Sequence, residues 1–212
     1  MVGAPADHND RMVPNWTIGP SWPGDYRDIY GTTNSWVCGS AYTSATTAGI
    51  RRGALWPYSQ SADVCRCPSD RSLWPYGAQR APRPFNVSLS EAMNGGVNGV
   101  NGRAMHPVVV ERLSELRRPA GLFTFMDEEA PSMTSGGFFV PPPPDLDYWW
   151  MIPGARDRAC GANVAFADGH AIFKKWQYLD RTRTGPLTPV QKERDRADLI
   201  WVQSAIPGLG GQ

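Results

Sequence analysis

Three acidic side chains stand where this sequence predicts strands to end. Asp127 and Glu128 close an apolar stretch that begins at Leu122, and Asp168 lies between two further apolar runs. If the two strands are neighbours, the three carboxylates can bind a hard cation such as calcium together with backbone oxygens. The structural alternative is that Asp168 forms a turn while the other two accept hydrogen bonds from loops.

The same carboxylates could also hydrolyse a glycosidic bond, because a pair of acids can supply the required acid and base. The nine tryptophans suggest a different alternative, a surface module that stacks against carbohydrate. Other chemistries lack their motifs: the sequence has no GxSxG around a serine, no phosphate-binding loop, no dinucleotide motif and no zinc pattern. His170 is expected to be a sheet residue whose ring packs on Trp176 or bonds a carbonyl, with a metal or catalytic role as the alternative.

The four cysteines allow two interpretations. Cys65 and Cys67 are too close together for a CxxC metal or redox motif, while Cys38 and Cys160 lie far away. Buried free thiols and long-range disulfides are both compatible with this spacing. A disulfide would place the chain in an oxidising compartment.

The elements that must position these groups centre on residues 160–176. Asp168-Gly169 separates two alternating apolar runs, which predicts a two-residue type I′ turn. That turn would set Phe166 opposite Ala171 and Val164 opposite Phe173. Since both faces of this hairpin are largely apolar, we expect it in the centre of its sheet.

The rest of the chain predicts short elements separated by loops. With 212 residues, of which 22 are Gly and 20 are Pro, it fits a single domain, 1–212, that begins with a loop-rich segment, 1–35. The class expected is α+β, an antiparallel sheet with the central Asp-Gly hairpin, long Gly/Pro-rich loops and few short helices. Strands are predicted at 64–67, 85–89, 122–126 and 138–140, a Gly/Asn loop at 94–102, and helices around 46–55, at 107–117 and at the C-terminus, 188–206.

Charge and hydropathy exclude some partners. The formal net charge of +1 offers no electrostatic basis for binding nucleic acid or an anionic membrane surface. No apolar run approaches the length of a membrane span, and the first residues do not resemble a signal peptide. The chain is therefore expected to be cytosolic, or a mature or truncated form.

Several stretches, in chain order, resemble a bacterial family of type IV pilin-like and type II secretion pseudopilin-like proteins, of the kind typical of planctomycete and verrucomicrobial genomes. The family's C-terminal signature is a His, nine further residues and Asp-Gly, which corresponds here to Asp168-Gly169, with Arg158 in place of the His. The similar segments are 7–15, 53–58, 67–70, 125–128, 163–170, 180–182 and 198–203, together with Trp176.

The resemblance implies the soluble head of a non-enzymatic structural subunit in an extracytoplasmic pilus-like or type II secretion pseudopilus-like assembly. Its partners would be further copies or other pilin-like subunits, at the cell surface, outside the cell or in the periplasm. Members of the family reach the membrane through an apolar N-terminal helix, which is absent from this chain. Major pseudopilins bind calcium in a C-terminal loop, which adds to the calcium expectation for Asp127, Glu128 and Asp168 without assigning individual ligands.

Overall fold

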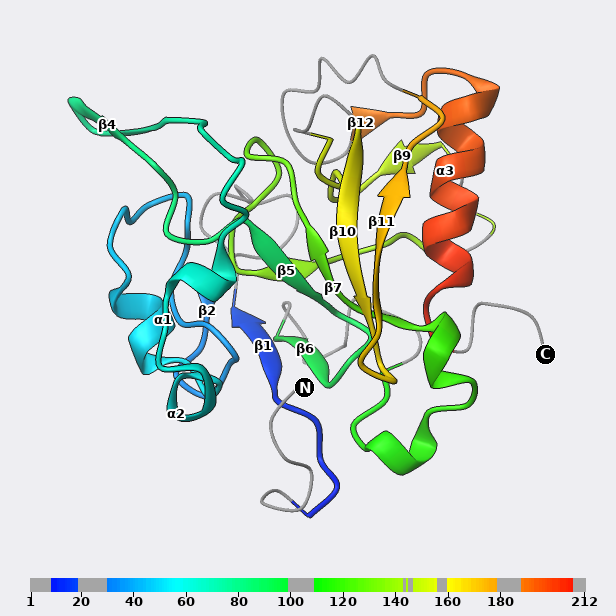
Figure 1. Cartoon of the computed structure of the whole chain (residues 1–212), viewed down its shortest axis with the longest axis horizontal. Coiled ribbons are helices and arrows are strands. Elements are labelled where there is room, and N and C mark those ends of the chain that lie inside the picture. Colours follow the sequence, from blue (N-terminus) through cyan, green and yellow to red (C-terminus); the bar gives the residue numbers. More distant parts are fainter. Residues whose placement is uncertain are drawn as a thin grey trace.

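The computed structural model describes residues 9–18, 30–98, 109–142, 144, 147–155, 160–178 and 188–207 (Figure 1). Within these ranges the chain is a mixed α+β structure with few helices and several antiparallel strand pairs. None of the helices in the described ranges has the length and hydropathy that crossing a membrane requires.

The main sheet has five strands in the order β11-β10-β7-β5-β8. All neighbours in it are antiparallel except β5 and β8. The strands are β5 Val87–Ser90, β7 Phe123–Asp127, β8 Gly137–Phe138, β10 Gly161–Phe166 and β11 Ala171–Lys175.

Three smaller sheets surround it. A three-stranded sheet has the order β2-β1-β6, with β1 and β6 parallel, and the other two sheets are two-stranded. Their strands are β1 Asn15–Ile18, β2 Tyr30–Gly31, β6 Gly95–Asn98, β3 Trp74–Tyr76, β4 Gln79–Ala81, β9 Tyr148–Trp149 and β12 Thr188–Pro189. Strand β1 lies in the segment predicted as loop, and β6 in the predicted Gly/Asn loop. Both predictions missed because each strand depends on a partner that is remote in sequence.

The helices are short, as expected. The α-helices are α1 Ala48–Arg52, α2 Trp56–Ser59 and α3 Glu193–Ser204, and the 3₁₀ turns are η3 Asp63–Cys65, η4 Leu113–Glu115 and η5 Pro119–Gly121. The predicted strand at 64–67 is wrong, because η3 occupies its first half.

The predicted helix at 107–117 is also wrong in its described part, from residue 109 onward. The amide of Val110 donates to the carbonyl oxygen of Ala92 (2.9 Å), and its own carbonyl accepts from Asn94 (2.7 Å). Backbone groups used in this pairing cannot make helical i to i−4 bonds, so only the 3₁₀ turn η4 remains. Residues 107 and 108 lie outside the described residues.

The pairing of β10 with β11 differs from the prediction by one residue. Ala165 faces Ala171 and Val164 faces Ile172. The amide of Phe166 donates to the carbonyl of His170, so residues 167–169 form the connection, and only Gly169 of these has a positive φ (+94°). This is the three-residue loop with a left-handed glycine, rather than the type I′ turn. Strand β11 is also the edge of the sheet, so the hairpin is not central.

Helix α3 begins later than expected and buries a different face. Thr188 and Pro189 pair with β9 instead of starting the helix. The sequence predicts an apolar face of Val190, Ala197, Ile200 and Trp201, but Ile200 is 46% exposed. The buried side chains are Asp195, Asp198, Leu199, Val202 and Gln203. The buried face therefore includes two carboxylates, which hydropathy alone assigns to the surface.

A core cluster lies against each face of the main sheet. One core cluster joins the sheet to α3 and includes Val164, Trp176 and Leu199. A second cluster, which includes Trp36 and Leu89, joins the sheet to the segments around α1 and α2. Figure 1 shows α3 on one side of the main sheet and α1 with α2 on the other.

Candidate functional site

The three predicted carboxylates do not meet. Strand β10 runs antiparallel to β7, with Val164 opposite Met126, so the start of β10 lies beside Asp127. Asp168 follows the other end of β10 and is roughly 16 Å further along, at about 3.3 Å per residue. The turn that holds it is therefore at the opposite end of the sheet from Asp127.

Asp127 and Glu128 are adjacent in sequence but serve different neighbours. The Asp127 carboxylate accepts two hydrogen bonds from Asn163. The fully buried Glu128 carboxylate accepts from the hydroxyl groups of Ser88 and Ser132. In the described ranges, no group of three or more His, Cys, Asp or Glu side chains is placed to hold a metal ion. The structure does not bring the three carboxylates together, and calcium binding stays a prediction.

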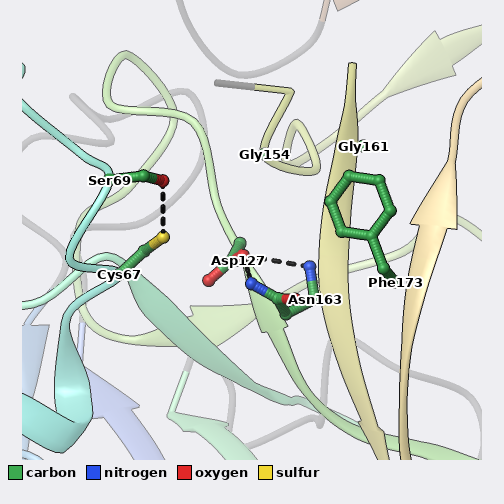
Figure 2. A pocket seen from close by; sticks show the side chains of 7 residues that line it. All are labelled: Cys67, Ser69, Asp127, Gly154, Gly161, Asn163 and Phe173. Atoms are coloured by element: carbon green, nitrogen blue, oxygen red, sulfur yellow. Dashed lines mark hydrogen bonds between the residues drawn. The ribbon is translucent and has the colours of Figure 1, made fainter. Parts of the chain in front are cut away.

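Around Asp127 the structure forms a small pocket, which we call the Asp127 junction (Figure 2). Its volume of about 20 Å³ has room for one water molecule or a small ion. Its lining comes from the loop after η3, from β7, β10 and β11, and from the segment before residue 156. The lining residues are Cys67, Ser69, Asp127, Gly154, Gly161, Asn163 and Phe173.

Hydrogen bonds at the junction hold chain segments together. The amide and the side-chain Nδ2 of Asn163 donate to Asp127 Oδ2, at 3.0 and 2.9 Å. The amide of Gly154 donates to the backbone carbonyl of Asp127 at 2.7 Å. Figure 2 shows the Asn163 contacts, and separately the thiol of Cys67 beside the hydroxyl of Ser69, 3.0 Å apart. Asp127 therefore ties β7 to β10 and to the loop at Gly154.

Two glycines let these segments approach closely. A Cβ atom at Gly161 would lie 2.4 Å from the carbonyl oxygen of Lys174 and 2.6 Å from the ring of Phe173. A Cβ atom at Gly154 would lie 2.9 Å from the Cβ of Asp127. Contacts this short exclude any side chain, so glycine at both positions is a requirement of packing.

The loop of residues 67–70 is attached to the start of β5 by the buried amide of Asn86. Its Nδ2 donates to Asp70 Oδ2, and its Oδ1 accepts from the amide of Cys67, both at 2.7 Å. Asn86 and Asp70 are 0% and 3% exposed. Sequence reasoning did not single out Asn86, Asp70 or Asn163 as site residues. Asp70 and Asn163 lie inside two of the segments that resemble the pilin-like family, and this resemblance is the one feature of the sequence that pointed to them.

No family model, curated protein or solved structure matches this chain. The pilin-like resemblance therefore stays a prediction. The structural observation relevant to this resemblance is where the segments 67–70, 125–128 and 163–170 lie in the fold.

The cysteines of the described structure are all free thiols. Burial raises the pKa of Cys65 to about 11 and also raises the pKa of Cys38. Both thiols are therefore protonated at neutral pH, and a protonated thiol is a poor nucleophile.

His170 and Asp168 form a local pair at the turn. The His170 ring stacks on Phe166 with centroids 4.3 Å apart, and its Nδ1 lies 2.6 Å from Asp168 Oδ1. Hydrogen bonding to the His170 side chain lowers the pKa of Asp168. The expected packing of His170 on Trp176 is wrong: the ring stacks on Phe166, and the length of β11, about 20 Å at 3.3 Å per residue, separates it from Trp176.

A larger hollow lies at this end of the sheet, with a volume of about 190 Å³. Asp168 is the only carboxylate among its lining residues, which are mostly apolar and include Met12, Met93 and Phe125. An apolar hollow offers a cation few oxygen ligands.

Three of the eight described tryptophans belong to the interior. Trp36, Trp149 and Trp176 are buried, and each indole N–H donates to an acceptor inside the protein, respectively Gly136 O, Asp195 Oδ1 and Gly154 O. Among the described tryptophans only Trp16 is classed as exposed, at 39%. These three rings are therefore used in packing and are not available for stacking against carbohydrate.

Replacing Asp127 with alanine is expected to lower the free energy of unfolding by about 2 kcal/mol, because two hydrogen bonds to a carboxylate are lost. Asn163→Ala keeps the backbone donor and should cost about half as much. A double-mutant cycle measured by urea denaturation should show a coupling of about 1 kcal/mol between the two side chains. If the losses of stability in the two single variants simply add in the double variant, the two side chains do not interact as the structure shows.

Proposed function

We propose that this chain is the head of a non-enzymatic structural subunit in an extracytoplasmic pilus-like or type II secretion pseudopilus-like assembly. The observation that carries the proposal is the placing of the segments that resemble this family. Residues 67–70, 125–128 and 163–170 lie far apart in sequence and contribute to the main sheet or its immediate neighbours. Four residues from these segments, Cys67, Ser69, Asp127 and Asn163, line one junction.

Side chains from these segments bind the chain itself. Asp127 joins two strands, Asp70 is bound to Asn86, and the Asp168 carboxylate accepts from the backbone amide of His170. A hydrolase needs carboxylates that converge on a substrate-sized cleft. At Asp127 the pocket holds about 20 Å³, and the other two carboxylates of the predicted set are elsewhere. Signature residues used in this way favour a structural role.

The arrangement of the sheet supports the same proposal. If this chain is a pilin-like head, its family signature lies in three elements: the Asp-Gly turn, β10 and β7. Here Phe123 and Met126 of β7 and Val164 of β10 are fully buried in the core cluster that joins the sheet to α3. The signature would then mark the strands that build the head.

Localisation in the native cell tests this proposal. We expect an epitope-tagged chain in the cell envelope or in material sheared from the cell surface, where it co-purifies with other pilin-like subunits. Protease added to intact or outer-membrane-permeabilised cells should digest it while a cytosolic marker survives. Recovery of the chain with the cytosolic marker, protected from protease, would overturn the proposal.

A further inference from the structure

Strand β11 is an open edge of the main sheet. Among the described strands it pairs only with β10, and its residues Ala171, Ile172, Phe173 and Lys175 are exposed. The strand at the other edge, β8, is buried at both of its residues. An exposed edge strand presents unpaired backbone donors and acceptors to any strand that can reach it.

The register with β10 determines which backbone groups point outward. Val164 faces Ile172, and the bonds Phe166 N to His170 O and Trp176 N to Cys160 O flank that pair. In an antiparallel ladder, residues that bond to one neighbour alternate with residues whose N–H and C=O point the other way. The outward set on β11 is therefore Ala171, Phe173 and Lys175. No bond to their backbone groups is present among the described residues.

We propose that two copies of this chain associate through β11, paired antiparallel about a two-fold axis at Phe173. Phe173 then faces Phe173 of the second copy, and Ala171 faces Lys175. Three outward residues on each copy carry one N–H and one C=O each, so this register forms six hydrogen bonds and leaves none of these groups unpaired. A two-fold axis between residues would pair outward residues with inward ones.

The side chains are compatible with this register. The Phe173 ring lies over Gly161, whose Cβ position would be 2.6 Å from its Cζ, so the ring leans toward β10 and leaves the edge accessible. Each Lys175 stands opposite Ala171, and each Lys174 opposite Ile172, so no two lysines face each other directly. The Lys174 ammonium lies 4.4 Å from the Trp201 ring centroid, which turns its charge toward α3.

The size of the contact predicts a weak dimer. Six hydrogen bonds correspond to an interface of about 600–1,200 Å², at about one bond per 100–200 Å². That is the lower end for specific association, so the dimer should form in proportion to concentration. Lys174 of each copy is a diagonal neighbour of the other at about 7–8 Å, so added salt should strengthen pairing. This inference goes beyond the proposed function, and its tests are independent of the localisation experiment.

Disulfide trapping tests the register. In this pairing the Phe173 Cα atoms of the two copies are about 5.5 Å apart, within the range that a disulfide bridges. Phe173→Cys should therefore form a covalent dimer on mild oxidation. Lys175→Cys, equally exposed on the same strand, faces Ala171 and should cross-link no faster than the unsubstituted chain, which controls for the native thiols. Equal cross-linking of the two variants would overturn the register.

Proline substitution tests the backbone contacts. The Ala171 N–H points outward, so Ala171→Pro removes two of the six intermolecular bonds without removing a bond to β10. Sedimentation over a range of concentrations should show association at least about tenfold weaker than for the unsubstituted chain. Ala171→Val keeps the N–H and should dimerise normally. Circular dichroism melting must show both variants folded, and an unsubstituted chain that stays monomeric at all concentrations overturns the proposal.

Discussion

Replacing Asp198 with alanine should lower the free energy of unfolding by about 3 kcal/mol. Its buried carboxylate accepts hydrogen bonds from the amides of Gln177 and Tyr178, at 3.0–3.1 Å. These amides lie two and three residues beyond the end of β11, so Asp198 ties the end of the main hairpin to α3. Bonds to a charged acceptor each contribute about 1.5–3 kcal/mol, and alanine takes this acceptor away from both amides. Urea denaturation of the purified variant measures the loss.

Two substitutions bracket this effect. Asp198→Asn keeps one acceptor oxygen and should lose about half as much stability as Asp198→Ala. Glu193→Ala removes a carboxylate from the same helix whose side chain is 90% exposed, and should change stability by less than about 0.5 kcal/mol. A loss at Asp198 no larger than the loss at Glu193 would contradict a structural role for the buried acid.

Replacing Glu91 with glutamine should remove a pH dependence of stability. Glu91 is 5% exposed, and burial, aided by the nearby Glu128, raises the pKa of its carboxyl from 4.5 to about 8. Between those two values native Glu91 holds a proton that the unfolded chain has released. Raising the pH through this window therefore favours unfolding, and the contribution of Glu91 falls by about 1.4 kcal/mol per pH unit.

The measurement compares the unsubstituted chain with Glu91→Gln at several pH values from below 4.5 to above 8. The stability difference should shift in favour of the glutamine variant through the window and become constant above it. Glu193→Gln, at an exposed carboxylate, serves as the control and should follow the unsubstituted chain. Parallel pH profiles for the unsubstituted chain and Glu91→Gln would show that the Glu91 carboxyl is not held protonated.

Close packing around Glu91 explains why a buried acid can persist there. A Cβ atom at Gly137 would lie 1.8 Å from its Oε1, and one at Gly95 would lie 2.7 Å from its Oε2. Two glycines therefore make the space that the carboxyl fills. Sequence reasoning treated residues 94–102 as a loop and did not consider Glu91, because a buried glutamate leaves no hydropathy signal.

Elements stabilised by local pattern were predicted most reliably. Alternation in 85–89 and 122–126 predicted β5 and β7 to within two residues, and the short helix predicted around 46–55 contains α1. The failures share a different cause. The described part of the helix predicted at 107–117 does not form, because the backbone of Val110 pairs with Ala92 and Asn94 instead. The helix predicted to start at Thr188 begins later, because Thr188 pairs with β9. Each competing partner is distant in sequence and so invisible to a local pattern.

The candidate site shows the same division. The sequence named Asp127, Glu128 and Asp168 because acids at strand ends are typical ligands, and it required only that the strands be neighbours. The strands are neighbours, but their antiparallel direction places Asp168 at the far end. The Asp127–Asn163 contact depends on the same register, and no property of either residue alone predicts it.

The turn at Asp168-Gly169 separates what the sequence determined from what the tertiary structure decided. Sequence by itself determined that the chain reverses here, since glycine adopts the left-handed conformation that the connection needs and its neighbours are strand formers. The loop length, and with it the face that each β11 side chain occupies, depended on packing against β7 and α3. A change of one residue in register moves every side chain of the strand to the opposite face of the sheet. Which of the two registers forms is therefore determined by the contacts buried on each face.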